Sequence, residues 1–138
     1  MVEGSGGSGG GTGKRVLIAE DQTGMRGLVR WLVDLEDDLT VAAEATTGQE
    51  ALEAAVAVRP DAVVLDLGLP VIDGEDVLPA LRAQLPAARI VVLSGQASAI
   101  IQPRLIELGA DAVVEKDSAA PGWQTELLAQ LRLAHSPT

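Results

Sequence analysis

Residues 62–74, AVVLDLGLPVIDG, contain the pattern that decides the fold: an aliphatic run, an acid that closes it, and a turn with Gly and Pro. The run 62–65 has no alternating polar positions, which is typical of a strand covered on both faces. Comparable runs occur at 15–19, 39–43, 90–93 and 112–114. The sequence therefore predicts five short strands in the centre of the molecule.

Apolar residues recur three and four positions apart between these runs, as on the buried face of an amphipathic helix. The five stripes are Met25, Leu28, Val29, Leu32 and Leu35; Ala51, Leu52, Ala55 and Val56; Val77, Leu78 and Leu81; Leu105, Ile106 and Leu108; and Leu127, Leu128, Leu131 and Ala134. Pro121 suits the first turn of the fifth helix, whereas Pro79 and Pro103 predict that the third and fourth helices start late or kink.

Strands that alternate with helices predict an α/β fold, a doubly wound parallel sheet with right-handed crossovers and helices on both faces. Two strand orders are common in such sheets, and the order 2-1-3-4-5 fits five strands.

The two ends of the chain differ in composition from this alternating part. Residues 1–13, MVEGSGGSGGGTG, cannot bury enough surface to offset their ordering entropy, so they are predicted to be a flexible linker or an added expression tail. Residues 14–134 are predicted to form one domain and 135–138 a short tail.

The composition excludes several classes of function. The chain of 138 residues has 20 acids and 10 bases, a net charge of −10, and no Phe, Tyr or Cys. An acidic, aromatic-poor chain repels phosphate backbones and offers no stacking platform, so we expect no direct binding to nucleic acid. The absence of Cys suits a reducing compartment, and no apolar run is long enough to cross a membrane. We therefore expect a soluble, cytoplasmic domain.

Polar side chains follow four of the five predicted strands. They are Glu20 and Asp21 after the first, Asp66 after the third, Ser94 after the fourth and Lys116 after the fifth. In an open parallel sheet the carboxyl ends of the strands meet at one edge, where ligands bind beside the first strand. We therefore expect these residues to share one crevice, whereas the second strand, at the edge of the sheet and ending near Glu44, need not contribute.

Three carboxylates in one crevice repel one another unless a cation lies among them, and hard oxygen ligands favour Mg²⁺. Mg²⁺ and a lysine around a single aspartate are the parts that phosphoryl transfer requires. Asp66 is the predicted nucleophile that forms an acyl phosphate, Lys116 pairs with a phosphoryl oxygen, and Ser94 donates a hydrogen bond to another.

Each of these residues also fits a structural role when it is taken alone. Acids and a Ser-Gly pair after strands are common in loops, and Lys116 between Glu115 and Asp117 fits a solvated charge cluster. Their coincidence at the ends of successive strands is what favours a functional site.

The segments RVLIAED, VVLDLGLPVIDG, VVLSG and GADAVVEKD occur in this order. Across residues 14–134 the sequence resembles the receiver domain of two-component response regulators. The resemblance implies a flavodoxin-like fold in which Asp66 accepts a phosphoryl group from the phosphohistidine of a sensor histidine kinase or a phosphotransfer protein. It also implies that Asp21, Asp66 and the backbone carbonyl of Gly68 ligate Mg²⁺ or Mn²⁺, with Glu20 acting mostly through water.

The resemblance further assigns Ser94 to the switch position and Lys116 to the family's lysine, and makes Gly68 and Gln96 the positions that tune loss of the phosphoryl group. The sequence departs from the family at Val113, where an aromatic residue usually stands. Valine is stiff and small, so we expect activation to be transmitted by the segment after Ser94 and by the fourth helix.

The resemblance also implies that activation can create a homodimer through the fourth helix, the fifth strand and the fifth helix. Lys116 is followed by Asp117-Ser118, an ending similar to that of receivers attached to helix-turn-helix domains, so the chain is either a stand-alone receiver or a piece of a longer regulator. By this interpretation the chain is no enzyme beyond its own phosphorylation and dephosphorylation.

Three alternatives stay open at this point. A phosphatase of the haloacid dehalogenase type also uses an Asp nucleophile with Mg²⁺, but it needs a second Asp where this chain has Gly68. A flavodoxin-like electron carrier would place its flavin phosphate against Glu20 and Asp21, where a Gly- and hydroxyl-rich loop belongs. A receiver-like interaction module that works without phosphorylation is the third.

Overall fold

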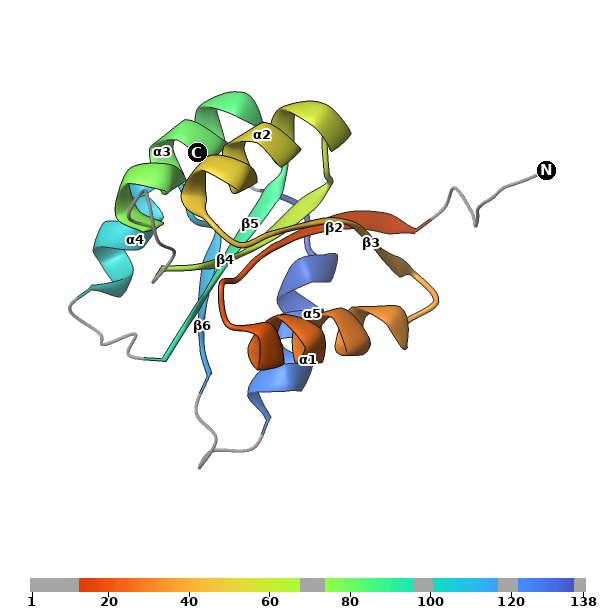
Figure 1. Cartoon of the computed structure of the whole chain (residues 1–138). Coiled ribbons are helices and arrows are strands. Elements are labelled where there is room, and N and C mark those ends of the chain that lie inside the picture. The colour runs from red at the N-terminus through yellow and green to blue at the C-terminus, as the bar shows by residue number, and fades with distance from the viewer. Residues whose placement is uncertain (1–12, 68–73, 96–100, 117–121, 136–138) are drawn as a thin grey trace.

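Strands and helices alternate along the whole of the described chain, which comprises residues 13–67, 74–95, 101–116 and 122–135 of the computed structural model (Figure 1). The elements are β2 (Lys14–Ala19), α1 (Thr23–Asp34), β3 (Leu39–Ala45), α2 (Gly48–Val58), β4 (Ala62–Asp66), α3 (Gly74–Gln84), β5 (Arg89–Ser94), α4 (Gln102–Leu108), β6 (Ala112–Glu115) and α5 (Trp123–Arg132). None of these helices has both the length and the apolar character needed to cross a bilayer.

The described strands form one parallel sheet in the order β3-β2-β4-β5-β6, which is 2-1-3-4-5 in chain order. The predicted flavodoxin-like fold is therefore confirmed. Several strands run further than the aliphatic runs predicted, because the ladder continues into the polar residues that close them. Asp66 pairs with Leu93, and Ser94 pairs with Glu115.

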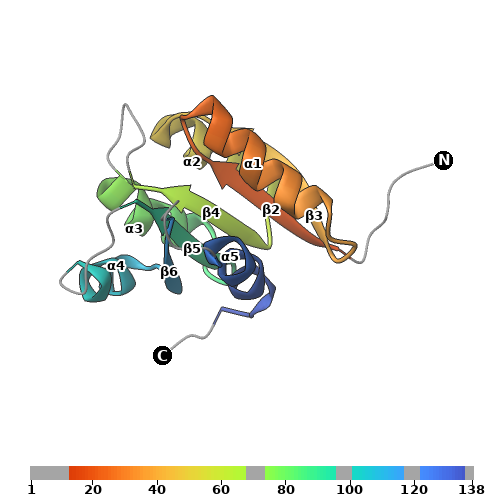
Figure 2. The ribbon, with the colours of Figure 1, turned by 90° about the horizontal axis from the view of Figure 1, so that it is seen from below.

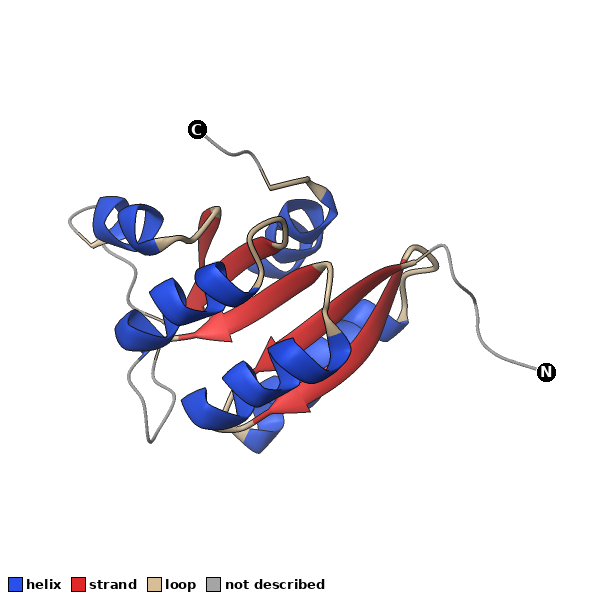
Figure 3. Ribbon diagram, turned by 90° about the horizontal axis from the view of Figure 1, so that it is seen from above, coloured by secondary structure: helices blue, strands red, loops and turns tan. Residues whose placement is uncertain are grey.

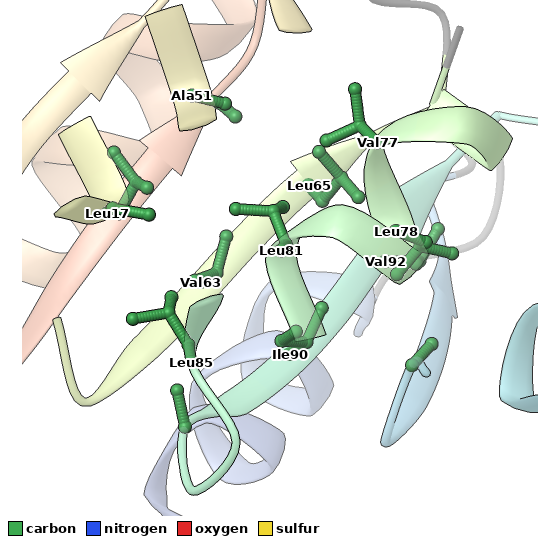
Figure 4. Packing of buried hydrophobic residues seen from close by; sticks show 14 of the residues in the cluster. Leu17, Ala51, Val63, Leu65, Val77, Leu78, Leu81, Leu85, Ile90 and Val92 are labelled. Carbon is green, nitrogen blue, oxygen red and sulfur yellow. The ribbon is translucent and has the colours of Figure 1, made fainter. Parts of the chain in front are cut away.

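Helices cover both faces of the sheet, as predicted. The helices α2, α3 and α4 lie on one face (Figure 3), and α1 and α5 on the other (Figure 2). Successive residues of each central strand alternate between the two faces. Figure 4 shows Leu17, Val63, Leu65, Ile90 and Val92 beneath α3 and α2. Their strand neighbours Val16, Ile18, Val64, Val91 and Leu93 pack under α1 and α5.

The predictions based on prolines are only partly correct. The helix α3 starts five residues before Pro79 and continues past it, so the late start is wrong; the proline ring lies on the exposed side of the helix. Pro103 does stand in the first turn of α4, a helix of 7 residues. Pro121, predicted in the first turn of the fifth helix, lies outside the described residues. The helix α5 begins at Trp123.

Four residues of the predicted apolar stripes are exposed. Leu35, Val56 and Ile106 expose 58%, 53% and 47% of their surface, and Ala134 lies beyond the end of α5. Leu35 and Ala134 follow the last helical turn, whereas Val56 and Ile106 lie at the margins of their stripes, next to the buried Ala55 and Leu105. The spacing of apolar residues along a helix does not show how wide an arc of the helix surface its neighbours cover.

Arg82 joins α3 to the amino edge of the sheet. Its guanidinium donates to the carbonyls of Leu85, Ala88 and Gly109 and pairs with Asp111 at 2.8 Å. Asp111, whose side chain is 6% exposed, also accepts the N–H of Ile90 at 2.7 Å and contacts His135. Burial alone would raise the pKa of Asp111, but the hydrogen bonds from Ile90 and His135 and the charge of Arg82 outweigh it and lower the pKa.

We expect Asp111→Ala to lower the free energy of unfolding by about 2–3 kcal/mol, because it leaves the half-buried Arg82 and the Ile90 N–H without their acceptor. Urea denaturation followed by circular dichroism measures the loss. The matched control is Asp38→Ala, which removes an exposed partner of Arg132 and should have a much smaller effect. Equal losses in the two variants would contradict the role of Asp111.

The contribution of Asp111 should also depend on pH. Its folded-state pKa is lowered, so the stability is present above the carboxyl's unfolded pKa, about 3.9, and is lost as the pH falls towards the folded-state value. The difference between wild type and Asp111→Ala should therefore shrink below about pH 4.

Candidate functional site

Three carboxylates meet at the carboxyl edge of the sheet, where β2 and β4 end. Glu20, Asp21 and Asp66 each place an oxygen within 4.8 Å of the others. Glu20 is 1% exposed and Asp66 8%, whereas Asp21 lies at the surface. The three predicted acids therefore do lie together at this edge of the sheet.

The parallel register explains why the acids come together. Ala19 pairs with Leu65, so the next residue on each strand, Glu20 and Asp66, lies at the same level of the sheet. The N–H of Glu20 donates to the carbonyl of Ala45 at 2.9 Å, which keeps the chain extended one residue beyond β2. The chain then turns through Asp21 into Gln22, the N-cap of α1.

Lys116 reaches this site from the end of β6. Its Nζ lies 3.0 Å from Glu20 Oε1 and 3.8 Å from Asp66 Oδ1. Its N–H donates to the carbonyl of Ser94 at 2.8 Å, so the buried Ser94 and Lys116 hold each other at the same edge. Gly68 and Gln96, which the sequence analysis also named, lie outside the described residues.

Glu20 is the acid most affected by its surroundings. Burial, a hydrogen bond with Asp66 and the charge of Asp66 raise its pKa to about 7, although hydrogen bonds from Lys116 and the Gln22 N–H act in the opposite direction. The three acids thus form a site with too little positive charge for its buried carboxylates. A hard divalent cation with a preference for oxygen fits this donor set and would relieve the repulsion.

Val113 occupies the middle of β6 and is partly buried. It packs on the face covered by α4, against the cluster that contains Leu105 and Ala110. Its neighbour Val114 points to the opposite face, under α5.

No sequence pattern singled out Arg26, and the pattern of strand ends placed Glu44 outside the site. Arg26 Nη1 donates to the backbone carbonyl of Glu20 at 3.1 Å, and its Nε lies 3.3 Å from Glu44 Oε1. The edge strand β3 therefore does reach the acidic site, through α1. No spacing rule would have found this contact, because its acceptor is a backbone atom.

The sheet is parallel and doubly wound, and an acidic cluster and a lysine lie at its carboxyl edge. This is the arrangement that the resemblance to receiver domains implies. The family model described as the response regulator receiver domain matches residues 16–128, and this chain belongs to that family. The family resemblance inferred from the sequence is thereby confirmed.

Individual relatives agree with this assignment. A nitrate/nitrite response regulator protein homolog of Haemophilus influenzae is 35% identical over 104 residues, 75% of this chain and 50% of that protein. The chain thus spans about half the length of this relative.

Solved structures are similar over most of the chain. The response regulator domain of Thermotoga maritima CheB has a TM-score of 0.78 at 26% identity, over 87% of this chain and 94% of that one. A response regulator from Burkholderia pseudomallei, solved with a phosphorylated aspartic acid, a calcium ion and citrate, has a TM-score of 0.75 at 28% identity, over 86% and 66% of the two chains.

Repulsion within the acidic cluster should be measurable in metal-free protein. We expect Asp66→Asn to raise the free energy of unfolding in EDTA by about 1 kcal/mol, because it removes one of three clustered negative charges. Asp37→Asn removes the same charge from an exposed turn before β3 and serves as the control, with little expected change. Lower stability of Asp66→Asn would show that attraction to Lys116 outweighs the repulsion.

Proposed function

We propose that this chain is a phosphoacceptor signalling domain that takes a phosphoryl group onto Asp66 from a phosphohistidine and thereby changes its binding to a partner. The observation that carries the proposal is the position of Asp66: it is buried, clustered with Glu20 and Asp21, and has Lys116 Nζ 3.8 Å from its carboxylate. The membership of the receiver family supports the same function.

In the proposed reaction a carboxylate oxygen of Asp66 forms a bond to phosphorus while the donor's phosphorus–nitrogen bond breaks and its electron pair stays on the imidazole. Lys116, already 3.8 Å from Asp66 Oδ1, would pair with a phosphoryl oxygen. The hydroxyl of Ser94, which is buried at the end of β5, would donate a hydrogen bond to a second phosphoryl oxygen. The chain would catalyse only its own phosphorylation and dephosphorylation.

Asp21, Asp66 and the backbone carbonyl of Gly68 are the proposed ligands of Mg²⁺ or Mn²⁺, with Glu20 acting mainly through water. When bound, the cation would neutralise the charge that builds up on the transferring phosphoryl oxygens. Asp21 is exposed, whereas Glu20 is buried, so Asp21 would be the more accessible of these two carboxylates to an incoming cation.

Activation would be transmitted through the segment after Ser94 and through α4, because Val113 is too small and stiff to act as an aromatic switch. The proposed partners are a sensor histidine kinase or phosphotransfer protein and a second copy bound through α4, β6 and α5. If the chain is part of a longer regulator, we expect the output to lie in the remainder of that protein.

Phosphorylation of Asp66 can be tested directly. We expect wild-type protein incubated with acetyl phosphate and Mg²⁺ to gain one phosphoryl group in intact-mass spectra, and Asp66→Asn to gain none. Asp76→Asn, which removes an exposed carboxylate of α3, is the matched control and should be modified like wild type. Absence of modification in wild type, with acetyl phosphate and with a phosphorylated kinase, would favour an interaction module that works without phosphorylation.

Mg²⁺ should stabilise the fold through the same cluster. At a concentration one hundred times its Kd, it should add about 2.7 kcal/mol to the free energy of unfolding of wild type. Asp21→Asn should lose most of this gain, because it removes the most accessible carboxylate of the cluster, whereas Asp37→Asn should keep it. Thermal unfolding with and without Mg²⁺ at constant ionic strength measures the gain. Equal stabilisation of both variants would place the cation elsewhere.

A further inference from the structure

Arg26 lies in the first turns of α1 and contacts the chain that leads into Asp21. Its Nη1 donates to the backbone carbonyl of Glu20 at 3.1 Å, and its Nε lies 3.3 Å from Glu44 Oε1. The Arg26 and Glu44 side chains are only 20% and 24% exposed. Arg26 is therefore a semi-buried connection between α1, the end of β3 and the acidic site.

The carbonyl that Arg26 contacts belongs to the peptide unit that joins Glu20 to Asp21. Because a peptide unit is planar, the direction of this carbonyl also sets the direction in which the chain enters Asp21. The N–H of Glu20 is held by the carbonyl of Ala45 at 2.9 Å. Both backbone groups of Glu20 are thus held, one by β3 and the other by Arg26.

Glu44 in turn fixes the guanidinium of Arg26. It projects from β3, next to Ala45, and its carboxylate also pairs with Arg30, whose side chain is 56% exposed. The planar fork of an arginine can serve two acceptors at a fixed angle, here a carboxylate and a carbonyl. The position of the Glu20 carbonyl therefore depends on a chain of contacts that begins at the edge strand.

We propose that Arg26 is a positioning residue of the acidic site: it holds the Glu20–Asp21 peptide so that the Asp21 carboxylate lies beside Asp66 and is ready to bind a divalent cation. This inference rests on the proposed function, because it assumes that the cluster takes Mg²⁺. Arg26 itself touches neither Asp21 nor Asp66 in the contacts described and acts through the backbone.

The sign of the effect separates positioning from charge. Removal of a cation near an acidic cluster makes the cluster more negative, so electrostatics alone would tighten Mg²⁺ binding. Loss of positioning would weaken it, since groups that orient metal ligands typically contribute about 10-fold or more to affinity. Arg26→Met should therefore raise the Kd for Mg²⁺ about tenfold. Arg26→Lys keeps the charge but lacks the fork, so it should also raise the Kd, by a smaller factor.

Arg30→Met is the matched control. Arg30 pairs with Glu44 as Arg26 does, and it also pairs with Asp34. Both of these carboxylates lie outside the acidic cluster. The variant Arg30→Met should either leave the Kd for Mg²⁺ unchanged or decrease it. Titration of Mg²⁺ by calorimetry at constant ionic strength gives the Kd values, and circular dichroism shows that each variant is folded.

A second measurement needs no metal. The Gln22 N–H donates to Glu20 Oε2 at 3.2 Å, so its hydrogen exchange, measured in the presence of EDTA, reports on the order of this turn. Exchange at Asp21 and Gln22 should be faster in Arg26→Met and unchanged in Arg30→Met. This readout still tests the positioning role if Arg26→Met binds too little Mg²⁺ for titration.

Mg²⁺ binding by Arg26→Met that is as tight as in wild type, or tighter, would overturn the positioning role, as would unchanged exchange at Asp21 and Gln22. Failure of wild type to bind Mg²⁺ at all would instead contradict the proposed function. The two failures are thus distinguishable in the same titration.

Discussion

The parallel pairing of β2 with β4 is the constraint on which the rest of the site depends. Both strands are covered on both faces, so their register cannot slip without exposing aliphatic side chains. The pair of Ala19 with Leu65 therefore delivers Glu20 and Asp66 to the same level of the sheet, where neither can move away from the other. A repulsive pair of buried carboxylates is held together by the hydrophobic core beneath it, and Lys116 from β6 offsets only part of the repulsion.

The opposite edge of the sheet shows the complementary arrangement. In a doubly wound fold the helices end where the strands begin, so carbonyls at helix C-termini gather at the amino edge. Basic side chains meet them there: Lys14 donates to Leu131, Arg15 to Val58, Arg59 to Gln84 and Arg89 to Gln130. Several of the ten basic residues thus neutralise helix ends, away from the acidic cluster, which leaves that cluster in need of another cation.

The residues at the strand ends could be predicted because all strands of a parallel sheet end at the same edge. A polar residue that follows each aliphatic run in the sequence is therefore placed at that edge. The acids and Lys116 were found in this way. Leu35 was wrongly assigned to the core because α1 ends one residue before it. Val56 was wrongly assigned because a periodic stripe does not show how wide an arc of the helix its neighbours cover. Pro79 was misjudged because a helix already packed through Val77, Leu78 and Leu81 tolerates a proline on its exposed side.

Arg26 could not be predicted, since its acceptor in the site is a backbone carbonyl.

These observations explain how an aliphatic core without Phe or Tyr can still support a precise site. Glu20, Asp66 and Ser94 lie on or directly beyond strands whose ladder hydrogen bonds hold them, and not on long loops. Lys116 reaches the site with a long side chain from β6, and its backbone N–H donates to the carbonyl of Ser94. A change at Asp66 would therefore affect Ser94 and Lys116 together, at the ends of β5 and β6. Val113 offers no large side chain to move, and α4 packs on the same face of the sheet as Val113, which is consistent with the proposed role of α4 in activation.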